Sequence, residues 1–279
     1  MQYLTEVKQS SKNLKNYKIL FFILLCLAVK STAQELVFKR AVPILSPQKV
    51  SLDRYNFAYV NDEKGNIFKI SPEGELIQTY SPQKKGDVTL LDAWRNVNIF
   101  VFYRSFQEFV ILDRFMNPSP HIRFERERVG FVQMAAYSSD NNLWVLDNDD
   151  FSLKKYNLEN TLILQKTSLD LILDPRTYDL NYMREYQNYL FVNDKNSGVL
   201  IFDNLGNYKS TMPIKGLNFF SFINNEIYFL QNNTIILRDL YSSKERSIAL
   251  PAGKEYIHAL IGDKIMYLFT KEGMEIYEM

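Results

Sequence analysis

The last seven residues, Gly273-Met274-Glu275-Ile276-Tyr277-Glu278-Met279, form an apolar strand that ends the chain in the middle of a repeat. From about Val50 onward, an apolar strand that is usually followed within two residues by Asn or Asp recurs every 38 to 47 residues. Equivalent positions in the six repeats are Val60, Phe102, Val145, Val192, Leu230 and Leu268. Each of the first five repeats accommodates four short strands, whereas the sixth has three. One strand is therefore missing from the last repeat.

The other end of the chain supplies the missing strand. Residues 35–42, Glu-Leu-Val-Phe-Lys-Arg-Ala-Val, are an apolar strand that belongs to none of the six repeats. A repeat of about 40 to 50 residues is typical of rings of four-stranded antiparallel sheets. The sequence therefore predicts an all-β protein, a six-bladed β-propeller with four-stranded blades, closed by the N-terminal strand 35–42, which completes the last blade.

The N-terminal region has the pattern of a secretory signal peptide. Lys12, Lys15 and Lys18 precede the apolar run 19–29, and the small residues of Ser31-Thr32-Ala33 follow it. A run of about 11 residues is shorter than the roughly 20 that a membrane-spanning helix needs. We therefore predict a signal peptide over residues 1–33 and a single propeller domain over 34–279. An uncleaved anchor and lipid attachment at Cys26 are the alternatives.

Cleavage after Ala33 would change the charge and remove the single cysteine. It would take away five of the 33 basic residues and one of the 32 acidic residues, which leaves a net charge of −3. Such a balance excludes the strongly basic surface that nucleic acids or anionic lipids select. A mature chain without cysteine is held together by its core rather than by disulfides.

The strand pattern and the period over residues 35–279 resemble those of the divergent six-bladed propellers of the NHL and YWTD kind. The resemblance is architectural, because no repeat carries a full family signature and glycines are scarce. A seven-bladed or differently phased ring is the alternative. Propellers support many functions, so the resemblance implies a fold and no particular activity.

Few residues point to catalysis or to a metal. His121 and His258 lie in different repeats without a partner at metal-ligand spacing, which favours structural roles. The densest acidic cluster, residues 147–150, lacks the spaced ligands and central glycine of a calcium loop, so we expect a solvated turn there. We therefore predict no catalytic residue, no metal and no cofactor.

Propeller topology indicates where a ligand would bind. Connections between blades share one face of the ring with the turns between second and third strands, and binding residues concentrate on such loops. The candidate binding residues on that face are Asn61, Asp62, Lys64, Arg104, Arg126, Arg128, Asp147, Asp149, Asp174, Arg176, Asn193, Asp194 and Lys195.

These features lead to two functional hypotheses. The first is an exported, non-enzymatic propeller that acts in the periplasm as a protein-interaction scaffold or accessory subunit of the cell envelope, for example of a secretion machine. Exposed aromatic residues beside arginine, with Phe115 and Phe151 as candidates, would then anchor an interface. The alternative is a propeller with a polar axial pocket that binds carbohydrate or another small ligand, or acts as a metal-dependent hydrolase of the lactonase or esterase kind. An extracellular or membrane-anchored location is the alternative to the periplasm.

Overall fold

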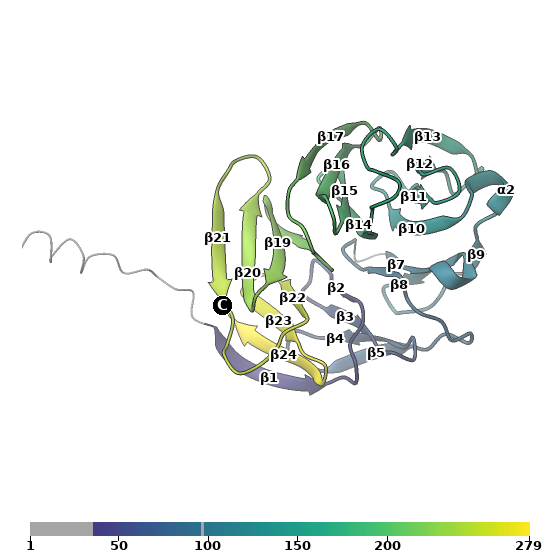
Figure 1. Ribbon diagram of the computed structural model, residues 1–279. Coiled ribbons are helices and arrows are strands. Elements are labelled where there is room, and N and C mark those ends of the chain that lie inside the picture. Colours follow the sequence, from purple (N-terminus) through teal and green to yellow (C-terminus); the bar gives the residue numbers. More distant parts are fainter. Residues whose placement is uncertain (1–35, 96–97) are drawn as a thin grey trace, which may run out of the picture. The chain divides into compact units, whose positions relative to one another are not determined.

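The computed structural model describes residues 36–95 and 98–279, which form a ring of six four-stranded antiparallel sheets (Figure 1). From the axis outward, blade one contains β2 (Val50–Leu52), β3 (Ala58–Asn61), β4 (Ile67–Ile70) and β5 (Leu76–Tyr80). Blade two contains β6 (Leu90–Asp92), β7 (Asn98–Tyr103), β8 (Glu108–Asp113) and β9 (Ile122–Arg123). Blade three contains β10 (Val132–Tyr137), β11 (Leu143–Asp147), β12 (Ser152–Tyr156) and β13 (Ile163–Ser168).

The other three blades follow the same plan. Blade four contains β14 (Leu180–Tyr186), β15 (Tyr189–Asp194), β16 (Gly198–Asp203) and β17 (Tyr208–Met212). Blade five contains β18 (Ser221–Ile223), β19 (Glu226–Gln231), β20 (Thr234–Asp239) and β21 (Glu245–Ala249). Blade six contains β22 (His258–Ile261), β23 (Ile265–Phe269), β24 (Gly273–Glu278) and, outermost, β1 (Val37–Pro43). The predicted six-bladed ring is thus confirmed, and the seven-bladed alternative is wrong.

Two short helical turns interrupt the strands of the described residues. They are η1 (Arg104–Phe106), between β7 and β8, and α2 (Arg126–Val129), between β9 and β10. Over residues 36–95 and 98–279, no helix has the length and the apolar character needed to cross a membrane. The predicted signal peptide and Cys26 lie outside the described residues.

The ring is closed by pairing between the two ends of the propeller (Figure 1). Strand β1 runs antiparallel to β24, with Val37 opposite Glu278 and Pro43 opposite Gly273. Beyond the strand, the amide of Ile44 donates to the carbonyl of Glu272 at 3.3 Å. The predicted closing strand is confirmed, with its bounds at Val37 and Pro43; Glu35 lies outside the described residues.

The Asp and Asn residues that follow many strands form tight turns. Asp62 Oδ1 accepts hydrogen bonds from the amides of Lys64 at 2.9 Å and Asn66 at 2.8 Å, and its Oδ2 accepts from Asn66 Nδ2 at 2.8 Å. The same arrangement recurs from Asp113 to Asn117 and from Asp203 to Asn207. Asp side chains bind nearby backbone amides in this way and so stabilise turns. The repeated Asp and Asn positions therefore have a structural role in the blades.

The hydrophobic core lies between the sheets rather than at the axis. Large aromatic side chains such as Trp144, Phe100 and Phe191 are almost fully buried. All five residues of β11 and all five of β12 are buried. Such strands have neighbouring blades on both sides, which explains the nearly continuous apolar sequence of β11 and the burial of even the two lysines of β12.

One buried arginine connects three blades of the ring. Arg184, on the innermost strand of blade four, is 2% exposed. Its Nη1 donates to Ser221 Oγ of blade five at 2.8 Å, and its Nη2 lies 3.3 Å from Asp92 Oδ1 of blade two. Its guanidinium also lies 5.3 Å from the centre of the Trp94 ring, within the range of a cation–π interaction. Arg184 thereby joins three blades at the centre of the fold.

Deleting residues 36–43 is expected to destabilise the ring, because it removes β1 and exposes the edge of β24. We expect the melting temperature to fall by more than about 10 °C, since each kcal/mol shifts it by about 2–4 °C in a domain of this size. Circular dichroism melts of the full chain and the deletion variant measure the change. A double variant, Lys39→Ala with Arg40→Ala, keeps the strand and serves as the control. An unchanged melting temperature in the deletion variant would contradict the closure.

Candidate functional site

Blade-to-blade connections and the turns between second and third strands lie on one face of the ring, which we call the loop face. This arrangement follows from the strand order of every sheet. The turns after β3, β7, β11 and β15 and the connections before β10 and β14 all belong to it. All the candidate residues chosen from the sequence therefore lie on or directly beside this face, although they are not gathered at one point.

A cavity of about 530 Å³ opens on the loop face near the axis. We call it the axial mouth. It is lined by residues at the starts of the innermost strands of blades one to four and by the neighbouring turns, including Lys49, Asn61, Asp62, Arg104, Gln133 and Asn181. Its volume is in the range of ligand-binding pockets. Three of the predicted residues, Asn61, Asp62 and Arg104, are brought together here.

The cationic side of the axial mouth is built around Lys49. Lys49 is partly buried at the entry to β2, where its amide donates to Asn61 Oδ1 at 2.8 Å. Burial, and then the positive charges of Arg104 and Lys195, lower the pKa of Lys49. Among the described residues, the side chains of Lys49 and Arg104 make no hydrogen bond or ion pair. The structure therefore holds an unneutralised cation at the wall of this cavity.

The amides beside the mouth are fixed by their own hydrogen bonds. Asn61 and Asn193 are buried, and Asn193 Nδ2 donates to Asn181 Oδ1 at 2.5 Å and to the carbonyl of Leu217 at 2.6 Å. Asn193 Oδ1 is buried without a hydrogen-bond partner among the described residues. These contacts hold the wall of the mouth in one arrangement.

The carboxylates near the mouth already have partners or lie at its rim. Asp62 accepts hydrogen bonds within its own turn. Asp179 Oδ2 lies 3.8 Å from Lys195 Nζ. Asp194 is buried and accepts hydrogen bonds from the amide of Asp179 at 2.6 Å and from the amide of Ser197 at 2.8 Å. Asp194 is thus a turn-stabilising residue and not an open ligand.

Several predicted residues lie away from the axial mouth and form ion pairs at the outer part of the loop face. Arg126 makes a two-pronged pair with Asp149, with both N–O distances 3.0 Å. Arg176 pairs in the same way with Asp174. Lys64 is exposed in its turn, and Arg128 Nε lies 2.6 Å from Glu125 Oε2. Surface pairs of this kind add little stability, and they leave these charges less available to a ligand.

The expected solvated turn is found at residues 148–150, which are exposed, but Asp147 at its start is not solvated. Asp147 is 1% exposed, and its Oδ2 lies 2.5 Å from Nζ of Lys154, which is also buried. Lys154 additionally lies 2.9 Å from Asp150 Oδ2 and donates to the carbonyl of Val129 at 3.1 Å. No feature of the sequence indicates that Lys154, in the next strand, is buried beside Asp147. The ammonium group of Lys154 thus lies beside Asp147 and Asp150, where a metal ion would otherwise have to bind.

The two histidines lie at different depths. His121 lies 3.7 Å from Glu108 at the outer part of blade two, and its Nε2 is 3.3 Å from Tyr80 Oη. His258 Nε2 is 3.0 Å from the carbonyl of Gln48, and its Nδ1 is buried without a partner among the described residues. Burial lowers the pKa of His258 to about 4, so this ring is neutral at pH 7.

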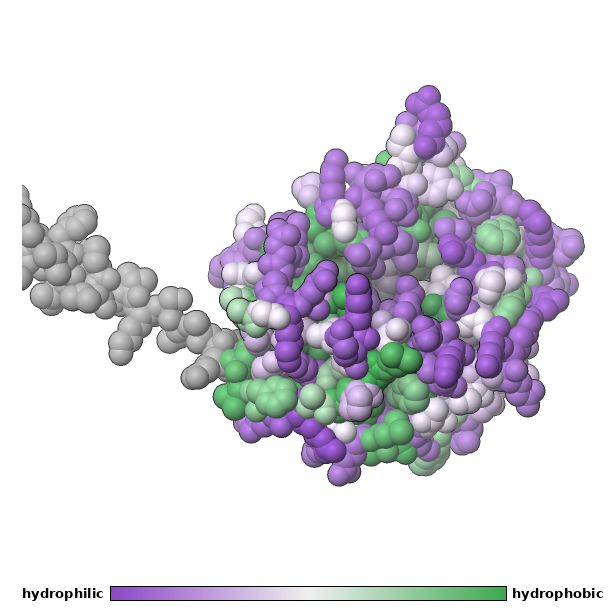
Figure 2. All heavy atoms as spheres, turned by 60° about the horizontal axis from the view of Figure 1, so that its bottom comes forward, coloured by the Kyte–Doolittle hydropathy of each residue, from purple (hydrophilic) through white to green (hydrophobic). Residues whose placement is uncertain are grey.

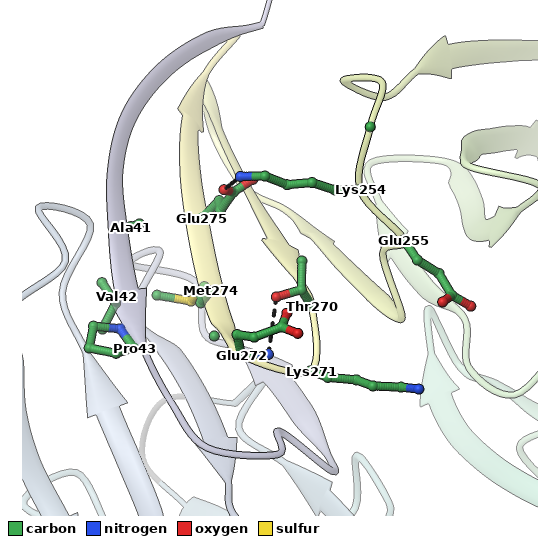
Figure 3. A pocket seen from close by; sticks show the side chains of 12 residues that line it. Ala41, Val42, Pro43, Lys254, Glu255, Thr270, Lys271, Glu272, Met274 and Glu275 are labelled. Carbon is green, nitrogen blue, oxygen red and sulfur yellow. Dashed lines mark hydrogen bonds and ion pairs between the residues drawn. The ribbon is translucent and has the colours of Figure 1, made fainter.

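A second pocket, of about 560 Å³, lies at the outer rim over the closure (Figure 3). Lys254 reaches over it to Glu275, and Tyr256 Oη and Tyr277 Oη each lie 2.9 Å from Glu275 Oε2. Burial alone would raise the pKa of Glu275, but the hydrogen bonds from these donors outweigh burial, and the pKa is lowered. Because the Glu275 carboxylate is already surrounded by donors, this pocket is a weaker candidate than the axial mouth.

Exposed apolar residues occur on both faces of the ring, and on the loop face they include Leu45 and Leu171, which are 67% and 92% exposed. Tyr55, Phe115, Leu205 and Tyr241 are 54–70% exposed, and all lie in turns of the opposite face. The guanidinium of Arg114 lies over the Phe115 ring, 4.7 Å from its centre, as expected for an exposed aromatic residue beside arginine. Figure 2 shows a largely hydrophilic surface with small apolar groups, one of them where the described chain begins.

Lys49, Gln133, Asp179 and Asn181 are residues of the axial mouth that sequence reasoning missed. Lys49, Gln133 and Asn181 stand at or just before innermost strands, whose first residues reach the axis on the loop face. A polar residue at that position of successive repeats was the available signal. The described residues contain no group of three His, Cys, Asp or Glu side chains that could hold a metal ion.

Replacing Lys154 by methionine is expected to lower the free energy of unfolding by about 3–5 kcal/mol, because it leaves Asp147 charged and buried without its partner. Urea denaturation measures the change. The control is Lys166→Met, which removes an exposed lysine 2.7 Å from Asp150 and should cost less than about 1 kcal/mol. Equal stability of the two variants would contradict the structural role of Lys154.

Acid should weaken the fold through His258. Between pH 6.5 and 4 the unfolded chain binds a proton at His258 that the folded chain does not, so the free energy of unfolding falls as the pH decreases through this window. The contribution is at most about 3 kcal/mol. Urea denaturation at pH 7.5 and 5.0 should show a smaller loss in His258→Gln than in the unaltered protein, and an equal loss would count against it.

Comparison with known proteins supports the fold. No family model matches the sequence, and no curated protein matches it. Solved structures that are similar include the Pan2 WD40 domain of Neurospora crassa, with a TM-score of 0.58, 9% identity, and coverage of 88% of this chain and 96% of that one. YCF48 bound to a D1 peptide gives a TM-score of 0.56 at 9% identity, with coverage of 90% and 98%.

An enzyme is also among the similar structures. A catalytically inactive virginiamycin B lyase of Staphylococcus aureus with quinupristin gives a TM-score of 0.55 at 9% identity, with coverage of 84% of this chain and 80% of that one. At such identities the likeness concerns the fold alone. The resemblance to six-bladed propellers is therefore confirmed at the level of architecture.

Proposed function

We propose that this protein is an exported, non-enzymatic β-propeller that presents its loop face to a protein partner in the cell envelope. The observation that carries the proposal is the axial mouth, where Lys49 and Arg104 have no internal partner for their charges. The other charged and amide side chains described on this face mostly form internal hydrogen bonds or ion pairs. Fixed loops on a rigid scaffold suit recognition, because little conformational freedom is lost on binding.

The export step rests on the N-terminal sequence. Lysines followed by an apolar run and a Ser-x-Ala site are the marks of a signal peptide. The periplasm is the compartment we propose, and an extracellular or anchored protein is the alternative. The solved structure of YCF48 with a D1 peptide supports a peptide or protein partner, because it shows that a similarly folded chain binds a peptide.

A second candidate function is the binding of a small polar ligand in the axial mouth. The amides of Asn61, Gln133 and Asn181 line it, and such groups suit sugars as well as peptides. The metal-dependent hydrolytic form of this alternative has less support, because Asp147 and Asp194 are both committed to internal contacts.

Affinity capture from crosslinked envelopes with surface variants tests the proposal. The loop-face variant is Lys64→Glu with Arg104→Glu, and the matched control on the opposite face is Tyr55→Ser with Phe115→Ser; Lys64, Arg104, Tyr55 and Phe115 are all exposed. We expect the unaltered protein and the control to recover the same stoichiometric partner, and the loop-face variant to lose most of it. Loss in the control alone would move the interface to the opposite face, and recovery of no partner would refute the scaffold function.

A further inference from the structure

The axial mouth has a charge arrangement that no internal group satisfies. Lys49 is flanked by Arg104 and Lys195, and both neighbours repel its positive charge. A partly buried ammonium is costly unless an anion compensates it. Of the three cations, Lys195 has Asp179 at 3.8 Å, whereas the side chains of Lys49 and Arg104 have no hydrogen-bond or ion-pair partner among the described residues.

The acids around the mouth limit what kind of anion fits. Asp62, Glu63, Asp87 and Asp179 line it, and Glu63 and Asp87 are exposed at its rim. A ligand with many negative charges would be repelled by this rim. A single negative group that reaches Lys49, carried on a neutral or basic segment, would meet attraction from both the cations and the rim.

The polar groups beside Lys49 suit a ligand that also forms hydrogen bonds. Asn61, Gln133 and Asn181 lie on the same wall, and amide side chains bind peptide groups through both donors and acceptors. The cavity is large enough for a short stretch of chain and too small for a folded domain. A carboxylate within a peptide therefore matches the mouth better than a free polyanion.

We propose that the axial mouth binds one carboxylate of the partner polypeptide, with Lys49 as its main ion-pair partner and Arg104 beside it. This inference rests on the proposed protein-binding function and names the group that the loop face recognises. The carboxylate belongs either to an Asp or Glu side chain or to the end of the partner chain. Both sources present the same charge to Lys49.

Fluorescence anisotropy with three labelled peptides distinguishes the sources. All three have the same neutral sequence with a blocked N-terminus: one has a central Glu and an amidated end, one a central Gln and a free carboxylate end, and one a central Gln and an amidated end. We expect the full chain to bind one or both carboxylate peptides at least about tenfold more tightly than the neutral peptide. Equal binding of all three, or of none, would overturn the inference.

Variants connect this preference to Lys49. Lys49→Met should remove the preference for carboxylate, whereas Lys244→Met, an exposed lysine on the opposite face, should retain it. The melting temperature of Lys49→Met is expected to equal or exceed that of the unaltered protein, because an uncompensated charge is removed. If this variant melts much lower, Arg104→Gln replaces it, with an expected loss of several-fold in carboxylate preference. A preference unchanged in both variants would overturn the assignment.

Capture from envelopes separates this inference from the proposed function. If Lys49→Met still recovers the same partner as the unaltered protein in equal amount, the scaffold function stands and the carboxylate site is refuted. If the unaltered protein recovers no partner, the scaffold function fails. A carboxylate preference that depends on Lys49 would then still support the site as a binder of carboxylate ligands.

Discussion

The whole ring depends on the backbone ladder between β1 and β24. These strands are separated by almost the entire propeller in sequence, yet they pair from Val37–Glu278 to Pro43–Gly273. Every other blade forms from neighbouring strands, so its pairing is local. Closure joins the two ends of the propeller and has to overcome the entropy of a very long loop. It also holds blade six against blade one, where His258 Nε2 lies 3.0 Å from the carbonyl of Gln48.

Closure also determines the geometry of the loop face. Because the ring is complete, the starts of the innermost strands are held around a common axis, and Lys49, Gln133 and Asn181 meet although they come from three blades. Keeping the Lys49 ammonium partly buried near other cations is unfavourable in free energy. The blades around it are stable enough to tolerate this. This division of roles, in which the sheets supply rigidity and the loops carry unsatisfied charge, is common where a scaffold serves recognition.

The architecture could be predicted because it depends on periodicity. Repeated apolar strands identified all six blades, and the unassigned strand before Val50 matched the incomplete blade at the chain end. Burial of charged side chains could not be predicted in the same way. Lys154 is one of two adjacent lysines in the strand Ser152–Tyr156, and only the packing of blade three shows that its ammonium group pairs with the buried Asp147. Lys49 lies just before the first innermost strand, but its proximity to Arg104 and Lys195 follows from the arrangement of the blades in the ring and could not be predicted from the sequence.

The buried side chain of Arg184 affects what could move between the blades at the centre of the ring. Its side chain spans from blade four to Asp92 and Ser221 and is almost fully excluded from water. The contacts of this side chain thus cross the ring from blade four to blades two and five. A solute or polypeptide strand moving between these blades would have to displace the guanidinium from Asp92 and Ser221, so Arg184 is an obstacle built into the ring itself.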